Sequence, residues 1–392
     1  MKRIFVFLLV LAVAGISQAA PVVFNDPNLK AAVEAKLGIP NPEPADMLLL
    51  TTLDANHLGI SDLTGLQTAT NLTTLYLSNN NIGGLDLLAG LTKMQNLYLN
   101  GNPSINSLFP LSGMTDLRNL RVSGGNVINI SVVANFKKLV WLHLSDNVIS
   151  DITPIADNNS LKYLYLSLNN ISDINVLADP DVNNLRELDL SDNFISDINA
   201  LSGLTNLVNL KLRYNDLGNI NPLSGLTKLQ YLFLSGNDNI TDINAVKNMK
   251  SLVELALTDV NISDISPLAD VNQIKYLWLG YNQITNINAL TKDVNFITLS
   301  LSYNPLSFES WCVYLKQIIN NKPSATIFCN VLLNDRFTDM NDMQIFASKW
   351  LRQNCSLANG DCGGADFDES GEVDFLDFAI FAEWWMYWPS LP

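Results

Sequence analysis

The sequence is poor in residues on which many enzymes depend. It has two histidines, His57 and His143, and neither stands beside a plausible serine or cysteine nucleophile. No phosphate-binding loop or zinc motif is present. Glu187 and Asp189 could be drawn as a glycosidase pair, but no cleft is implied around them, so solvated surface is the favoured interpretation. We therefore predict that the chain is not an enzyme.

Basic residues are also scarce. The 23 lysines and arginines face 38 aspartates and glutamates, which gives a formal net charge of -15. An acidic chain of this kind is unsuited to nucleic acid and to anionic membrane surfaces. Beyond the N-terminal segment there is no long apolar run, so we expect no membrane insertion after that segment is removed.

Residues 1–19 have the pattern of a secretory signal peptide. Lys2 and Arg3 precede an apolar run that extends to Ala14, and a small-x-small site then favours cleavage after Ala19. An uncleaved anchor helix is the alternative, but the run is too short to span a bilayer. No cysteine follows the run, which argues against a lipoprotein. We expect a secreted protein that is extracellular or on the cell surface.

A repeat with a step of 22 residues fills the chain from Leu72 to Asn304, after a degenerate copy at 50–66. Each unit contains L-x-x-L-x-L-x-x-N. The L-x-L part predicts a short strand with the leucines inward and the intervening residue outward. One unit cannot bury its own apolar face, so the units must stack as a solenoid. We predict an α/β fold over 50–306, with about 12 repeats, parallel strands on a concave face and 3-10 or irregular turns on a convex face.

Two polar positions of the repeat have predicted roles. The asparagine that ends the motif has an amide that can pair backbone groups at the turn, and it recurs at 80, 102, 147, 169, 193, 215, 237, 282 and 304. A second polar residue stands where the convex turns need an N-cap. These predicted caps are Thr153, Asn175, Asn199, Asn221, Asn244, Ser266 and Asn288.

Both ends of the solenoid have predicted caps. At 20–49 we expect a short helix with Asp26 as N-cap, Pro27 at its first position and Gly38 as its stop. At 307–330 we expect a helix over 308–320 and a last strand over 325–329. Each cap would cover an open end of the stacked leucines.

The repeat resembles the leucine-rich repeat, and specifically the bacterial internalin-like class. The units of that class end in N-x-I-x-D-I-x-P-L, and this chain has Ile-Ser-Asp-Ile-Thr-Pro-Ile at 149–155 and Ile-Ser-Asp-Ile-Ser-Pro-Leu at 262–268. The segment 20–49 is similar to the helical N-terminal cap of that class. The resemblance implies a bacterial solenoid protein.

Aromatic side chains gather at outward strand positions. Adjacent strands lie about 4.8 Å apart, so those of consecutive repeats should touch. Aromatics favour strands in any case, but their clustering favours a site that binds a protein or a polysaccharide. The candidate ligand-binding residues are Tyr76, Tyr98, Trp141, His143, Tyr163, Tyr165, Tyr231, Phe233, Tyr276 and Trp278.

The composition changes at about residue 331, and a second repeat appears at an offset of 35 residues. The segments 339–350 and 374–385 match, and each has apolar residues at i, i+3 and i+7, as one face of a helix requires. We therefore predict a small all-α domain over 331–392.

The loop 366–377 has the ligand spacing of an EF-hand-like calcium site. It has carboxylates at positions 1, 3, 9 and 12, a hydroxyl at 5 and glycine at 6. An acidic solvated loop is the alternative. Aspartate at position 12, followed by a helix, resembles the dockerin type I module. That resemblance implies a cohesin-like partner, an accessory role in polysaccharide breakdown, and calcium ligation by Asp366, Asp368, Ser370, Glu372, Asp374 and Asp377.

The first half of this module keeps only Asp335, Asp339 and Asp342 of the pattern, so we predict one calcium ion per chain. The four cysteines of an exported chain indicate disulfides. Of three pairings we favour the local ones, Cys312 with Cys329 and Cys355 with Cys362. Free or metal-binding thiols are the alternative, although the spacing fits no zinc pattern.

Two functions remain open from the sequence. The first is a secreted, non-catalytic adaptor whose solenoid binds a protein or polysaccharide and whose dockerin-like tail docks it to a partner. The second is a structural or adhesion protein of the cell surface with a calcium-stabilised tail that docks nothing.

Overall fold

A computed structural model describes residues 19–291, 296–307, 310–321 and 323–328. The predicted signal sequence up to residue 18 and the dockerin-like segment 331–392 lie outside the described residues. So do the calcium loop and both predicted disulfides, each of which needs a cysteine at 329, 355 or 362.

In the described part of the chain, thirteen strands form a single sheet, in which every strand pairs in parallel with its neighbours in the sequence. In most strands the middle residue is buried and the two flanking residues point outward, as the L-x-L pattern predicts. The strands are β1 (Thr52–Asp54), β2 (Thr74–Tyr76), β3 (Asn96–Tyr98), β4 (Asn119–Arg121), β5 (Trp141–His143), β6 (Tyr163–Tyr165), β7 (Glu187–Asp189), β8 (Asn209–Lys211), β9 (Tyr231–Phe233), β10 (Glu254–Ala256), β11 (Tyr276–Trp278), β12 (Thr298–Ser300) and β13 (Thr326–Phe328).

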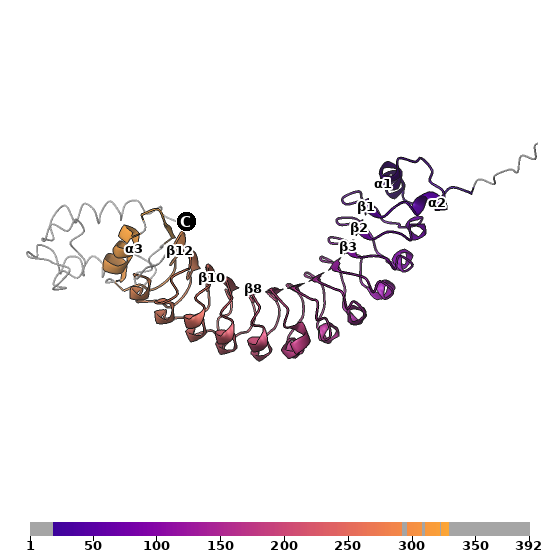
Figure 1. Ribbon diagram of the computed structural model, residues 1–392. Coiled ribbons are helices and arrows are strands. Elements are labelled where there is room, and N and C mark those ends of the chain that lie inside the picture. Colours follow the sequence, from indigo (N-terminus) through magenta and orange to yellow (C-terminus); the bar gives the residue numbers. More distant parts are fainter. Residues whose placement is uncertain (1–18, 292–295, 308–309, 322, 329–392) are drawn as a thin grey trace, which may run out of the picture.

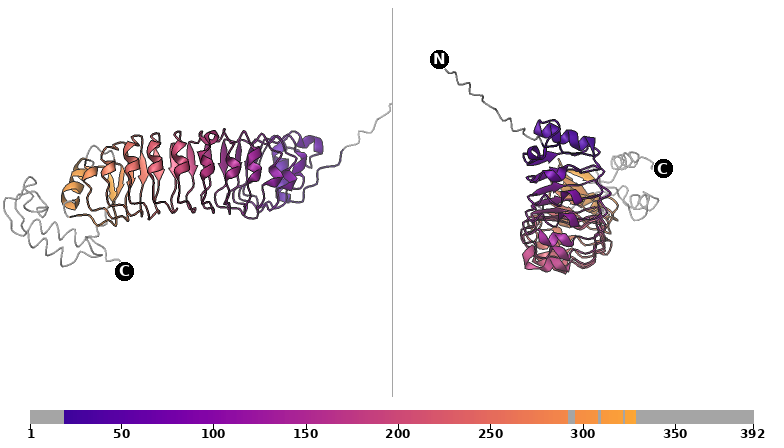
Figure 2. Two further views of the ribbon diagram at one scale, coloured as in Figure 1. Left: turned by 90° about the horizontal axis from the view of Figure 1, so that it is seen from below. Right: turned by 90° about the vertical axis from the view of Figure 1, so that its right-hand side faces the viewer.

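Short 3-10 helices form the opposite side of the repeats, as predicted. They are η1 (Leu66–Thr68), η2 (Asp86–Leu88), η3 (Phe109–Leu111), η4 (Ser131–Asn135), η5 (Thr153–Ile155), η6 (Asn175–Ala178), η7 (Pro180–Val182), η8 (Asn199–Gly203), η9 (Asn221–Gly225), η10 (Asn244–Asn248), η11 (Ser266–Leu268) and η12 (Asn288–Leu290). Figure 1 shows an arc with the strands on its inner side and these helices on its outer side. Seen from below, the helices stack side by side along the solenoid (Figure 2). The arc curves because helices need more width than paired strands.

The core is a continuous stack of leucines and isoleucines. In the repeat that contains β6, Leu161, Leu164, Leu166, Ile171 and Ile174 are each at most 2% exposed. Equivalent residues are buried in the repeats on either side. Each unit therefore buries its apolar face against its neighbours, as expected of a solenoid.

The recurring asparagine joins successive repeats, which confirms its predicted role. The Nδ2 of Asn169 donates to the carbonyl oxygens of Leu166 and Leu144, each at 3.0 Å. Its Oδ1 accepts from the N–H of Ile149 at 3.0 Å. One buried amide thus satisfies backbone groups of its own repeat and of the preceding one.

The predicted N-caps of the convex turns are wrong by two residues. Thr153 is the first residue of η5, and Ile152 occupies the cap position without a side-chain hydrogen bond. Asp151 takes the capping role, because its Oδ1 accepts the N–H of Thr153 at 2.9 Å. Asp or Asn does the same before the other predicted caps, at Asp173, Asp197, Asn219, Asp242, Asp264 and Asn286. The turns begin with this local side-chain to backbone bond, which short Asp and Asn side chains form readily.

The N-terminal helix α1 (Pro27–Leu37) begins and ends where the sequence predicts. The Oδ1 of Asp26 accepts from the N–H groups of Asn28 and Leu29, and Gly38 ends the helix at a φ of 68°. The Oδ2 of Asp26 accepts from the N–H of Ser61, so the cap residue also fastens the helix to the first repeat. A second short helix, α2 (Pro44–Met47), follows.

At the other end, a π-helical turn, η13 (Ser310–Tyr314), continues into α3 (Leu315–Asn321). The predicted helix over 308–320 therefore exists, with an unusual first turn, although 308 and 309 lie outside the described residues. β13 continues the sheet beside β12, as predicted. None of the described helices is long and apolar enough to cross a membrane.

Candidate functional site: the concave sheet

The concave sheet carries two columns of outward side chains. The first column holds the residue before each buried leucine, such as Trp141 paired with Tyr163. The second column holds the residue after it, such as Tyr76 paired with Tyr98. All ten candidate residues named from the sequence lie in these columns, on β2, β3, β5, β6, β9 and β11.

Over β2 to β6 the side chains form a continuous stack. The rings of Tyr76 and Tyr98 lie 4.6 Å apart with 5° between their planes. The Trp141 ring lies 4.5 Å from the Tyr163 ring and 5.3 Å from the Tyr165 ring. We call this surface the ring stack, and its members are Tyr76, Tyr98, Arg121, Trp141, Tyr163 and Tyr165.

Arg121 joins the two halves of the ring stack. Its Cζ lies 5.2 Å from the centre of the Tyr98 ring and 4.5 Å from that of Trp141. A guanidinium over an aromatic face contributes about 0.5–2 kcal/mol per contact. Our reading of the sequence missed Arg121, although its repeat position places it in the second column between Tyr98 and His143.

Beyond the ring stack, charged side chains continue across β7 and β8. Tyr165 donates its hydroxyl to the Glu187 Oε2 at 2.6 Å, and Lys211 Nζ lies 3.3 Å from the Asp189 Oδ2. Burial, and then the bond to Glu187, raise the pKa of Tyr165, so its hydroxyl stays protonated and continues to donate. Each carboxylate of the pair considered as a glycosidase site is thus engaged with a neighbouring side chain.

His143 makes the ring stack sensitive to pH. Its ring lies 5.4 Å from that of Tyr165. Burial, and then the nearby charge of Arg121, lower the pKa of His143 from 6.5, while Asp189 opposes them. The pKa of His143 in the folded chain lies below 6.5, so between these two values the unfolded chain binds more protons than the folded chain. The stability that neutral His143 contributes is therefore present above this window and is lost as pH falls through it.

We therefore expect His143→Gln to lose less stability than the natural chain when the pH falls from 7.5 to 5. Denaturant titrations of both proteins at the two pH values measure the difference. An equal loss in the two proteins would contradict the assignment.

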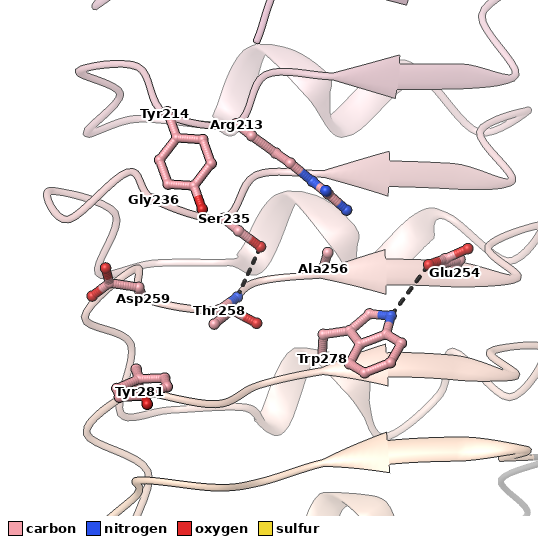
Figure 3. A pocket seen from close by; sticks show the side chains of 10 residues that line it. All are labelled: Arg213, Tyr214, Ser235, Gly236, Glu254, Ala256, Thr258, Asp259, Trp278 and Tyr281. Atoms are coloured by element: carbon pink, nitrogen blue, oxygen red, sulfur yellow. Dashed lines mark hydrogen bonds between the residues drawn. The ribbon is translucent and has the colours of Figure 1, made fainter. Parts of the chain in front are cut away.

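The second aromatic group, over β9 to β11, has a different geometry. Ala256 stands in the second column between Phe233 and Trp278, and a hollow of about 510 Å³ opens beside it. Arg213 lies over the Phe233 ring at 4.5 Å. Trp278 Nε1 donates to the Glu254 Oε1 at 3.2 Å (Figure 3). Among the described residues, no ring contact involves Tyr231, Tyr276 or Trp278. We call this surface the hollow.

No group of three or more His, Cys, Asp or Glu side chains within the described ranges is placed to hold a metal ion. The residues predicted to bind calcium lie outside those ranges. The described concave face therefore offers aromatic and charged side chains for contact with a ligand.

Family models of the leucine-rich repeat match parts of the chain. The model for leucine-rich repeats in two copies matches 70–113 and 205–248, and a second leucine-rich-repeat model matches 159–217. No curated protein matches the chain in sequence.

Solved structures share the fold. An internalin, InlF, from Listeria monocytogenes is 28% identical over 84% of this chain and 95% of its own, with a TM-score of 0.76. The functional domain of InlJ from the same organism is 20% identical over 79% of this chain and 81% of its own, with a TM-score of 0.54. A leucine-rich-repeat protein of Leptospira interrogans is also 20% identical, over 69% of this chain and 81% of its own, with a TM-score of 0.53. At these identities the last two comparisons establish the fold alone. Leucine-rich-repeat models thus match parts of the chain, and its solenoid is similar to that of an internalin.

Proposed function

We propose that the chain is a non-catalytic binding protein that acts outside the cell or on its surface, and that the ring stack binds another protein. The observation that carries this proposal is the position of Arg121 between Tyr98 and Trp141. Tyr, Trp and Arg are the residues most enriched at the energetically important centres of protein interfaces. The sequence predicted a candidate surface of this kind, and the contacts of Arg121 support the choice of its centre.

The stacking argues for a protein ligand and against a polysaccharide at this place. The Tyr98 ring lies between Tyr76 and Arg121, and the Trp141 ring between Arg121 and Tyr163. The faces of the Tyr98 and Trp141 rings, on which a sugar would lie, are therefore occupied. What remains for a ligand are ring edges, hydroxyl groups and the nearby charges, which suit the mixed polar and apolar surface of a protein.

The ring stack is also held in place before a ligand arrives. Tyr165 is fixed by its bond to Glu187, and Lys211 pairs with Asp189 beside it. Side chains that are already ordered lose less conformational entropy on binding. This rigidity supports a recognition surface in preference to a solvated one.

Position-specific photocrosslinking tests the proposal. A benzoylphenylalanine at Tyr163 places the reactive group in the ring stack, and the same group at Phe109, which is 75% exposed on η3, places it on the outer side. In a mixture of extracellular proteins we expect a discrete protein adduct from position 163 and none from 109. Equal adducts from both positions, or an adduct from 109 alone, would contradict the proposal.

For the tail we propose that the loop 366–377 binds one calcium ion and that the module 331–392 docks to a cohesin-like partner. The ligand spacing of the loop supports the first part, and the resemblance to the dockerin type I module supports the second. Secretion through residues 1–19 and the disulfides Cys312–Cys329 and Cys355–Cys362 are parts of the same proposal.

Calorimetric titration of the full chain should show one calcium ion per chain. Calcium that binds only the folded tail stabilises it by about 2.7 kcal/mol at a hundredfold excess over Kd. Chelation should therefore loosen the tail and leave the leucine-rich solenoid nearly unchanged. Asp366→Ala should act like chelation, whereas the matched control Asp339→Ala, in the incomplete half, should not. Two bound ions, or none, would overturn this part of the proposal.

A further inference from the structure

We propose that the hollow over β9 to β11 binds a neutral sugar ring of an oligosaccharide, at a site separate from the ring stack. The aromatic clustering in the sequence makes Phe233 and Trp278 candidates for binding a protein or a polysaccharide, but it does not distinguish this place from the ring stack. The inference rests on the shape of the hollow, the exposed face of one indole and the balance of charge around it.

The shape follows from one small residue. Ala256 pairs with Phe233 on one side and Trp278 on the other, so a large side chain is missing from the second column at that strand. The resulting volume of about 510 Å³ is in the range of small-molecule sites, which is roughly 300–1,000 Å³.

Trp278 presents an open aromatic face to this volume. Its neighbours in the second column are Ala256 and Ser300, which are too small to cover the indole. The bond from Nε1 to Glu254 fixes the ring, and Figure 3 shows the indole face on. The C–H groups on one side of a sugar ring are weakly positive and apolar, so they pack on the negative face of such a ring. The Trp141 indole, enclosed in the ring stack, cannot offer this contact.

The polar groups around the hollow favour a neutral ligand. Arg213 would repel a cation, and Glu254 and Asp259 would repel an anion. Sugar hydroxyls both donate and accept, so they can bind a guanidinium and carboxylates at the same time.

Two tyrosines border the hollow at unusual backbone positions. Tyr214 and Tyr281 have φ values of 50° and 55°, and they are 60% and 54% exposed. Asn79 and Gly101 occupy the equivalent position in earlier repeats, where a left-handed conformation is less costly. The Tyr214 ring lies over Gly236, where a Cβ would collide with it. The same left-handed position recurs along the solenoid, also at Leu168 and Tyr303 away from the hollow, so the repeat imposes it. Tyr214 and Tyr281 thus place exposed rings at the border of the hollow.

Titration of the full chain with neutral hexasaccharides tests the inference. The probes are the β-1,4-linked hexamers of glucose, xylose, mannose and N-acetylglucosamine, followed by calorimetry and by tryptophan fluorescence. We expect at least one of them to bind in a 1:1 complex and to change the tryptophan emission. If none binds with a Kd below about 10 mM, the inference is wrong.

Two variants locate the binding. Ala256→Tyr adds the large side chain that Tyr98 and Tyr165 place in the same column. Because Ala256 is only 2% exposed, the added ring must displace its neighbours, so circular dichroism has to show that the fold is kept. Ala256→Tyr and Trp278→Ala should each weaken the affinity for the hexasaccharide by at least about tenfold, with unchanged circular dichroism. Phe109→Ala, which removes an exposed ring on the outer side, should leave the affinity unchanged. Binding that survives Ala256→Tyr would place the sugar elsewhere and overturn the inference. None of these variants changes a residue of the ring stack, so the protein-binding proposal stands or falls separately.

Discussion

Asn193→Ala should lower the free energy of unfolding of the solenoid by about 3 kcal/mol. The Asn193 Oδ1 accepts the N–H of Ile171 at 2.9 Å, and its Nδ2 donates to the carbonyl oxygens of Leu166 and Leu190 at 3.0 and 3.1 Å. Asn193 is 6% exposed, so water cannot readily replace these partners. Each buried polar group that loses its hydrogen-bond partner costs about 1–3 kcal/mol. In Asn193→Ala the N–H of Ile171 loses its bond to the Asn193 Oδ1.

The matched control is Asn175→Ala in the preceding repeat. Asn175 is exposed at the start of η6, and its backbone N–H, which donates to Asp173, is kept in alanine. Denaturant titration of both variants should show a large loss for position 193 and a change within about 0.5 kcal/mol for position 175. Equal losses would mean that the asparagine column does not hold successive repeats together.

Trp141→Ala combined with Tyr165→Ala should weaken the affinity for the protein captured at position 163 by about thirtyfold or more, which is about 2 kcal/mol of binding free energy. The double change removes two rings of the ring stack and exposes the guanidinium of Arg121, which rests on Trp141. The solenoid should stay folded, because both side chains stand outside the leucine core and the loss of stability is limited to the contacts of the ring stack. Calorimetric titration of the purified partner measures the loss.

Two further variants separate the geometry of the ring stack from its charge. Arg121→Lys keeps the positive charge but loses the flat guanidinium that stacks on both rings, so it should also weaken binding. Phe109→Ala removes an exposed ring on η3 and should have no effect. Full affinity in Arg121→Lys would show that charge alone is recognised.

The fold could be predicted because one period determines it. The L-x-L spacing places Leu164 and Leu166 on the buried side and Tyr165 on the outward side, and the same spacing recurs in each repeat. The caps of α1 were equally accessible, because Asp26 and Gly38 act through local backbone geometry. Predictions of this kind need no knowledge of distant contacts.

The predictions that were wrong or incomplete concern local conformation, which the repeat period does not specify. The convex turns were assigned caps at the Thr153 position, whereas Thr153 is already the first residue of the turn and Asp151, two residues earlier, accepts its N–H. Arg121 was not among the candidate site residues, which were the aromatic residues and His143 at outward strand positions. Its contacts with Tyr98 and Trp141 depend on the rotamer.

The difference between the two aromatic groups also depends on geometry. The sequence places Trp141 and Trp278 at outward strand positions, without any sign that one ring is enclosed and the other open. The distinction follows from the neighbours, Arg121 and Tyr163 in one case, and Ala256 and Ser300 in the other.

Hydroxyl-radical footprinting of the chain, alone and with the captured protein, tests the central claim most directly. Oxidation of Trp141, Tyr163 and Tyr165 reports on the ring stack, and oxidation of Phe109 and Phe194, both well exposed, reports on surface away from it. We expect the partner to protect the three ring-stack residues and to leave the two phenylalanines as reactive as before. Protection of Phe109 or Phe194, with unchanged oxidation of the ring stack, would contradict the claim that the concave sheet binds the partner.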